Sequence, residues 1–187
     1  MKNLFLLFSA VFFVSVSTAQ TKVGGVTMPN TETYKNHKLV LNGSGVREKM
    51  WIDLYAAGLY LNQKNSDASA ILNGNEPMAI KLHIVSKLIR SDKMVDAVTE
   101  GFKNSTKGNT APIQEEINMI LGFFKEDIKK NDVFDLVYLP SEGGVVAYKN
   151  GEQKGVIKGM EFKKGLFGIW LSNRPADDGL RDDLLGK

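Results

Sequence analysis

The sequence predicts an α+β domain in which helices cover one face of a largely antiparallel sheet. Three observations support this prediction. Strand-like segments come first, two amphipathic helical segments occupy the middle, and strand-like segments return afterwards. Residues 78–86 alternate apolar and polar side chains, as a strand with one buried face does. Asn150 and Gly151 form a dipeptide that strongly favours a two-residue hairpin turn.

The chain of 187 residues begins with a segment typical of a secretory signal. Lys2 precedes apolar runs, and small residues follow up to Ala19. We therefore expect a signal peptide over 1–19, a single domain over 20–187, and export to the periplasm. No integral membrane segment is expected after cleavage. An uncleaved anchor is the alternative, although the apolar run is short for a membrane span.

Composition argues against several classes of function. The net charge is +3, and acidic and basic residues are interspersed, so we expect no dedicated nucleic-acid surface. The absence of cysteine excludes disulfides, thiolate metal sites and thiol nucleophiles. His37 and His83 lie far apart and lack the neighbours of a metal site or a catalytic triad. We therefore expect no metal and no cofactor.

The segment VREKMWIDLYAAGLYL, from Val46, reads as one long extended stretch. Arg47 and Tyr55 differ by an even number of positions, so in a regular strand they point to the same side. A straight strand would separate their Cα atoms by about 26 Å, too far for both to hold one small group. A shared ligand therefore requires a sharp bend, a bulge or a break into two strands between Glu48 and Asp53.

Two helices are predicted in the middle of the chain. Ser91 is the expected N-cap of a helix that extends to about Ser105. Met94, Val98 and Phe102 form its apolar stripe. A second amphipathic helix follows Pro112. Both helices are expected to lie on the sheet.

The remaining elements are predicted from turn signals and apolar runs. A short strand over 37–42 is expected to end at the turn-like NGSG segment. Strands that begin near Val133, Val145 and Glu152 form a meander. GLFGIWLS, from Gly165, is interpreted as a buried strand rather than a phosphate loop, because no Gly-Lys-Ser/Thr follows its glycines. A short helix is expected at the C-terminus.

Four stretches together carry a family resemblance: GSGVREKMWIDLYAAGLYL, MAIKLHIV before a capped helix, DVFDLVYLPSEGGVVAYKNGE, and GLFGIWLSNRPADDGLRDDLLG. Over about residues 23–186 the chain resembles the chalcone isomerase-like family, in its bacterial secreted branch. The resemblance implies an open-faced β-sandwich, in which a large antiparallel sheet carries a layer of helices. It also implies a ligand cleft between the sheet and the helices.

The resemblance implies little catalytic ability. Arg47 matches the arginine of the family's GxR segment, and Tyr55 stands where the plant enzymes have a threonine. The tyrosine, lysine and asparagine of the family's catalytic helix are matched by Ser91, Met94 and Val98. The two apolar side chains cannot orient water or polarise a carbonyl. We therefore expect no chalcone isomerase activity and assign no catalytic residue.

The fatty-acid-binding members of the family are a closer match. The chain resembles them in keeping the strand arginine and a tyrosine on the same strand, where the two residues hold a carboxylate. The resemblance therefore implies a small amphipathic or lipid-like ligand, a fatty acid or a similar carboxylate. Arg47 would contact its anionic head and Tyr55 would be the second donor. Met94, Val98 and Phe102 would meet the tail.

Other interpretations stay open. The protein could be an isomerase or lyase acting on a phenolic or enone substrate, or a structural or interaction protein whose cleft is collapsed. Arg47 could simply pair with a nearby acid such as Asp53. Tyr55 could be a core tyrosine with a satisfied hydroxyl. Trp51 and Trp170 are interpreted as core or cleft-wall aromatics.

Overall fold

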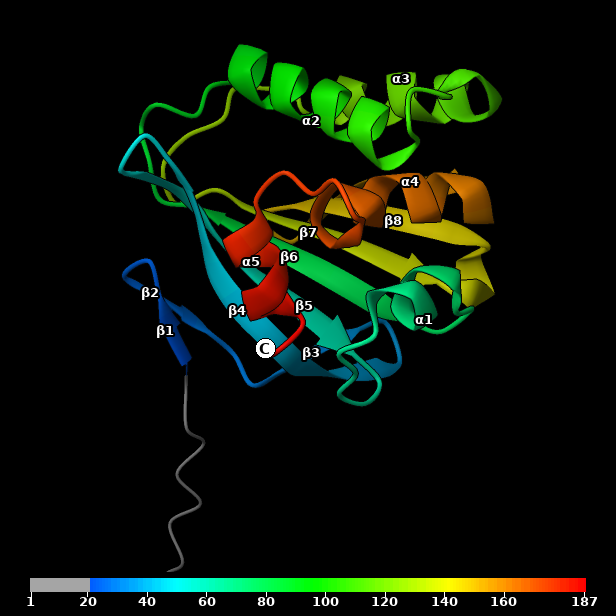
Figure 1. Cartoon of the computed structure of the whole chain (residues 1–187), viewed down its shortest axis with the longest axis horizontal. Coiled ribbons are helices and arrows are strands. Elements are labelled where there is room, and N and C mark those ends of the chain that lie inside the picture. The colour runs from blue at the N-terminus through cyan, green and yellow to red at the C-terminus, as the bar shows by residue number, and fades with distance from the viewer. Residues whose placement is uncertain (1–20) are drawn as a thin grey trace, which may run out of the picture.

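The computed structural model describes residues 21–187, and the predicted signal peptide over 1–19 lies outside them. A seven-stranded antiparallel sheet forms the centre, and each strand pairs with its neighbour along the chain (Figure 1). Its strands are β3 (Thr31–Tyr34), β4 (His37–Lys49), β5 (Ile52–Leu61), β6 (Met78–Ile84), β7 (Val133–Leu139), β8 (Gly144–Lys149) and β9 (Glu152–Lys158). A separate ladder joins β1 (Thr21–Val23) to β2 (Val26–Met28). The predicted α+β class is confirmed.

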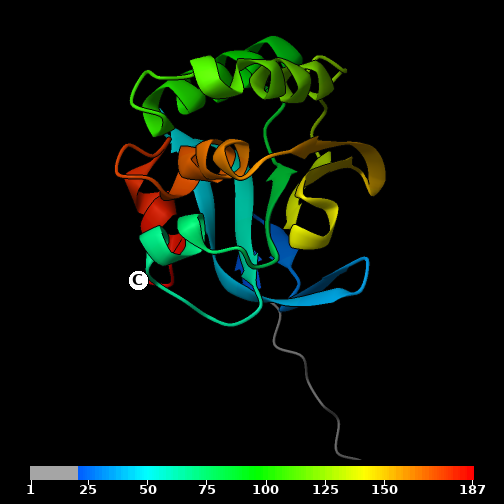
Figure 2. The ribbon, with the colours of Figure 1, turned by 90° about the vertical axis from the view of Figure 1, so that its right-hand side faces the viewer.

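The helices lie on one face of the sheet, as Figures 1 and 2 show. They are α1 (Ala68–Asn73), α2 (Ser91–Ser105), α3 (Gln114–Phe123), α4 (Met160–Leu171) and α5 (Asp178–Leu184), with short 3-10 turns over Ala111–Ile113 and Pro140–Glu142. One predicted detail is wrong by a residue. Arg90, not Ser91, holds the N-cap position of α2, and no side chain caps that helix.

Alternate residues of the strands enter two separate hydrophobic cores. Met78, Ile80 and Leu82 of β6 enter the core shared with the helices, as their alternation in the sequence predicts. Ala79, which lies between them, enters a smaller core that also contains Met28 of β2. The sheet is therefore buried on its helical face and covered in part on the other.

Strand β4 continues through the NGSG segment, where the sequence predicted a turn, with a register shift between Leu41 and Gly43. The glycines serve a close approach instead. A Cβ atom on Gly43 would lie 2.0 Å from the backbone oxygen of Asp183, and one on Gly45 would lie 2.3 Å from its Oδ2. Asn42 Nδ2 donates to the carbonyl of Leu184 at 2.8 Å. These contacts place α5 directly on β4.

The segment predicted as a buried strand from Gly165 is part of helix α4. Nearly every residue from Phe162 to Leu171 is buried. Figure 1 shows the helix between α2 and the sheet. A helix that is apolar on all sides has no 3.6-residue period, so its sequence resembles a buried strand. A Cβ atom on Gly168 would lie 2.9 Å from that of Ser105, which shows how closely α2 approaches.

One buried lysine joins α4 to α1. Lys163 is fully buried, and its Nζ donates to the carbonyl oxygens of Ile71, Leu72 and Gly74 at 2.8–2.9 Å. These carbonyls lie at the C-terminal end of α1, where lysine side chains commonly hydrogen-bond. Burial lowers the pKa of Lys163 to about 8, and the charge of Lys164 adds to that effect. The ammonium group therefore anchors α1 to the helical layer.

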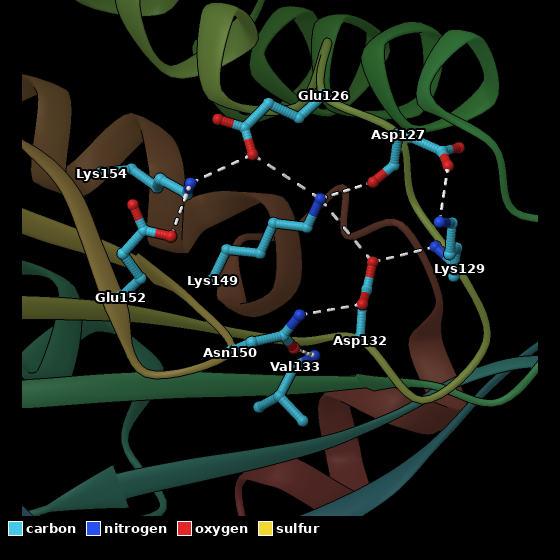
Figure 3. A network of polar contacts seen from close by, with 9 residues as sticks. All are labelled: Glu126, Asp127, Lys129, Asp132, Val133, Lys149, Asn150, Glu152 and Lys154. Atoms are coloured by element: carbon cyan, nitrogen blue, oxygen red, sulfur yellow. Dashed lines mark hydrogen bonds and ion pairs between the residues drawn. The ribbon is translucent and has the colours of Figure 1, made fainter.

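A network of charged side chains ties the connection after α3 to the β8–β9 hairpin (Figure 3). Lys149 lies 3.7 Å from carboxylate oxygens of both Glu126 and Asp132. Lys154 lies 3.1 Å from Glu126. Asn150, in the hairpin turn, donates to Asp132 at 2.9 Å. These charges are paired with one another, and we assign the network a structural role.

Two hairpins turn through a pair of residues with left-handed backbone conformation, but the residue types of the two pairs differ. Asn150 and Gly151 have φ angles of 52° and 81°, in agreement with the predicted hairpin turn. Met50 and Trp51, between β4 and β5, have φ angles of 51° and 66°. The left-handed conformation costs about 1–2 kcal/mol for a residue with an ordinary side chain. The β4–β5 turn is therefore strained by its own residues.

Replacing Met50 and Trp51 by Asn and Gly should raise the free energy of unfolding by about 1–2 kcal/mol, because these residues adopt the same turn with little strain. Few packing contacts are lost, since the two side chains are 82% and 94% exposed. Urea denaturation measures the change. The reciprocal variant, Asn150→Met with Gly151→Trp, should be destabilised by a larger amount, because it also loses the hydrogen bonds of Asn150 with Asp132 and Val133. A lower denaturation midpoint for the first variant would contradict the strain argument.

Lys163→Met should lower the free energy of unfolding by about 2–4 kcal/mol, because it leaves one buried and two partly buried carbonyls without their charged donor. The matched control is Lys164→Met. Lys164 is only partly buried and pairs with Glu161 at the surface, so its loss should change stability by less than about 0.5 kcal/mol. Chemical denaturation of both variants tests the difference, and equal effects would rule out the anchoring role.

Candidate functional site

Arg47 and Tyr55 lie directly opposite each other in the ladder between β4 and β5. The segment expected to be one extended stretch is divided into two strands by the turn at Met50 and Trp51. This break lies between Glu48 and Asp53, the region in which a site shared by Arg47 and Tyr55 was expected to need one. Directly opposed residues have Cβ atoms about 4.5–5.5 Å apart, so the separation of a straight strand does not apply.

Arg47 contacts a carboxylate of the chain itself. Its Nη1 donates to Asp177 Oδ2 at 2.7 Å and to the backbone oxygen of Glu48 at 3.3 Å. Asp177 is the N-cap of α5, and its Oδ1 accepts from the backbone N–H of Leu180 at 2.9 Å. Both side chains of the ion pair are 21% exposed. The partner of Arg47 is thus distant in the sequence and is not Asp53.

Tyr55 is buried beside this ion pair. Its hydroxyl oxygen accepts a hydrogen bond from Trp170 Nε1 at 3.0 Å. Within residues 21–187, no acceptor takes the proton of this hydroxyl. Burial raises the pKa of Tyr55; the Trp170 hydrogen bond and Arg47 oppose this rise, and Asp177 adds to it. The phenol is therefore neutral at physiological pH, and it offers one hydrogen-bond donor next to the guanidinium.

The two tryptophans differ in their placement. Trp170 is buried in α4, as expected of a core or cleft-wall residue. Trp51 is 94% exposed at the tip of the β4–β5 hairpin, so the prediction is wrong for this residue. The prediction treated the segment from Arg47 as one continuous strand. Trp51 lies in the turn between two strands, so the alternation of a strand does not apply to it.

Met94, Val98 and Phe102 are buried along one side of α2, as their spacing predicts. Phe102 stacks on Phe162 of α4, with ring centroids 5.8 Å apart. Helix α4 therefore already covers part of this apolar stripe. Contact between the three side chains and a ligand tail stays a prediction.

Two cavities border α1. The larger has a volume of about 540 Å³ and lies between α1, the C-terminal end of α2, and α4. The smaller, of about 370 Å³, lies between α1 and the ends of β5 and β6. Neither is lined by Arg47 or Tyr55. Arg47 and Tyr55 are instead in direct contact with side chains of the chain itself, Arg47 with Asp177 and Tyr55 with Trp170.

Comparison with known proteins places the fold. A family model described as chalcone isomerase-like matches residues 20–186. The chain belongs to the chalcone isomerase-like family. A solved fatty-acid binding protein of Arabidopsis thaliana is similar in structure, with a TM-score of 0.68 and 18% sequence identity, over 87% of this chain and 92% of that one. No curated protein matches the sequence. The chalcone isomerase-like fold expected from the motifs is therefore confirmed.

The sequence did not predict Asp177 as the ion-pair partner of Arg47. Its position directly before a short helix is a recognisable N-cap signal. That signal predicts a hydrogen bond to the helix and says nothing about a partner 130 positions away. The tertiary contact of α5 with β4 brings the two side chains together.

The acidic residues of α5 repel one another at this contact. Burial raises the pKa of Asp183, and the charges of Asp177 and Asp182 add to the rise. A carboxyl group whose pKa is higher in the folded state binds its proton more tightly there. Its favourable effect on stability is present at acid pH and is lost as the pH rises through its folded pKa.

Asp183→Asn should therefore raise the free energy of unfolding at pH 7 by about 0.5 kcal/mol, the magnitude typical of one unfavourable charge at a helix C-terminus. The difference from the unmodified protein should disappear below the ordinary carboxyl value of 3.8, where the aspartate is neutral in both states. Thermal unfolding across this pH range measures it. A difference that persisted at low pH would point to packing rather than charge.

Proposed function

We propose that this chalcone isomerase-like protein is exported and binds a fatty acid or a similar amphipathic carboxylate between its sheet and its helices. The observation that carries the proposal is the carboxylate contact of Arg47, made beside the hydroxyl donor of Tyr55. A guanidinium and a neutral phenol are donors suited to a carboxylate. The fatty-acid binding protein of similar fold supports the same class of ligand.

The ligand head would take the place of Asp177. The Arg47 guanidinium already holds a carboxylate at 2.7 Å, so binding would exchange one carboxylate for another. A partly exposed ion pair contributes about 1 kcal/mol or less, so the exchange has a modest cost. Asp177 precedes α5, whereas Asn42 and Gly43 of β4 contact the other end of that helix, so Asp177 can be displaced while these contacts stay in place.

The ligand tail would lie along the apolar stripe of α2. Met94, Val98 and Phe102 belong to the main core, and a small separation of α2 from α4 would expose them. Each buried methylene contributes about 0.8 kcal/mol. Tail length should therefore dominate the affinity, while Arg47 sets the orientation of the ligand.

A structural or interaction protein with a closed cleft is the second candidate. One observation favours it: neither described cavity reaches Arg47. An isomerase or lyase has less support, because Met94 and Val98 provide no hydrogen-bond donor for a carbonyl.

Arg47→Gln should weaken binding of hexadecanoate about tenfold or more, because it removes a charged hydrogen-bond donor from the head group. Binding of hexadecanol, which has the same tail and no charge, should change little. Asp177→Asn should strengthen hexadecanoate binding about fivefold, since it removes the competing charge. Asparagine remains a good N-cap, so α5 is preserved. Calorimetric titration measures all three proteins.

The pattern of results separates the candidates. Equal losses for the acid and the alcohol in Arg47→Gln would remove the assigned role of the guanidinium. No binding of either ligand by the unmodified protein or by Asp177→Asn would favour the closed-cleft candidate. Thermal unfolding of Asp177→Asn checks that the variant stays folded, so that a gain in affinity can be assigned to the released guanidinium.

A further inference from the structure

Exposed apolar side chains gather at one end of the molecule. Five large apolar side chains are exposed within residues 21–187, and four come from two neighbouring segments. Met50, Trp51 and Ile52 form the β4–β5 tip, with exposed fractions of 82%, 94% and 41%, and Leu88 is 60% exposed. The loop that carries Leu88 begins beside Leu54, whose carbonyl accepts two of its backbone N–H groups. Figure 1 shows the tip and this loop at the same end.

The conformation of the tip indicates that these side chains do not serve the folding of the hairpin. Met50 and Trp51 both adopt left-handed φ angles, which ordinary side chains disfavour. The same chain makes its β8–β9 hairpin with Asn150 and Gly151, which suit that geometry. Strained residues that persist in a structure are commonly found where function requires them. Here the strain holds a tryptophan and a methionine out in solvent.

We propose that the apolar tip, formed by Met50, Trp51, Ile52 and Leu88, inserts into the interfacial layer of a lipid bilayer. Tryptophan favours this layer because its ring is apolar and its N–H is polar. A stable protein interface buries about 800 Å² on each partner, an area that needs some 20–30 residues on each side. Four side chains at a narrow tip are too few for such an interface, but they suit a shallow membrane anchor.

The charges around the tip are mixed. Lys49 and Lys87 are exposed beside it, where they can reach anionic head groups. Glu48 and Asp53 oppose each other across the hairpin and offset these cations. Arg90 pairs with Asp92. Contact with the bilayer is therefore mainly apolar, and anionic lipid strengthens it modestly.

The proposed anchor is peripheral and does not rest on the proposed ligand. No helix within residues 21–187 is long and apolar enough to cross a membrane. Arg47 is three positions before Met50 on the same hairpin, so docking by the tip would bring the polar pair close to the head groups. The surface that receives an amphiphile and the surface that meets the bilayer would then lie at one end of the protein.

The test is flotation with vesicles of phosphatidylcholine, with and without about one quarter phosphatidylglycerol, using the protein as isolated from an exporting host. The unmodified protein should float with both vesicle types. The double variant Met50→Asn with Trp51→Gly should bind at least tenfold more weakly, although its turn is less strained. Met119→Asn is the matched control, since Met119 is 49% exposed on α3, away from the tip, and should change nothing.

Tryptophan fluorescence adds a second readout. Trp51 should shift to shorter wavelength with vesicles and be quenched by brominated lipid, whereas Trp170 is buried and should not respond. Absence of vesicle binding by the unmodified protein would overturn the proposal. Equal binding by the tip variant, or an equal loss in Met119→Asn, would also overturn it. Self-association through the tip without vesicle binding would assign the surface to a protein contact instead.

Discussion

Burial of α4 on every side is the constraint on which the other helices depend. Its apolar surface can be covered only if the sheet lies on one side and α2 on the other. The helix then provides fixed points for its neighbours. Lys163 holds the C-terminal end of α1, and Trp170 donates to Tyr55 beside the candidate site. The candidate site, which is built on β4 and β5, is therefore also connected to the helical layer through α4.

The polar pair of Arg47 and Tyr55 is occupied by groups of the chain itself. Asp177 supplies a carboxylate to the guanidinium, and Trp170 supplies a donor to the phenol oxygen. Such a site is closed but can still bind a carboxylate, because the carboxylate of a ligand could replace that of Asp177 on the guanidinium. The exchange requires displacement of Asp177 at the start of α5 and not movement of the sheet. This property connects the closed arrangement with a binding function.

The β4–β5 hairpin joins two features that are unrelated in the sequence pattern. Its base carries the polar pair, and its tip carries the strained, exposed Met50 and Trp51. In a protein that binds amphiphiles, a bilayer contact at the tip would bring the base close to a supply of ligand. The hairpin would then act as one unit in both processes.

The sequence by itself determined the α+β class, the family, the alternation of β6, the α2 stripe and the Asn150–Gly151 hairpin. These features are local or periodic, so they appear in the order of residues. The sequence also showed that a shared site of Arg47 and Tyr55 needed a break between them. It misassigned the NGSG segment and α4, because close packing and burial on all sides leave no periodic signal.

Only the tertiary structure decided what meets the candidate site. The turn at Met50 and Trp51 lacks the usual turn residues, so its strain is visible only in the backbone. The pairing of Arg47 with Asp177 depends on α5 packing across Gly43 and Gly45, a contact between the two ends of the domain. Residue spacing describes neighbours along an element, whereas such contacts are selected by the burial of whole elements against each other. For that reason the residues of the site could be nominated from the sequence, but their partners could not.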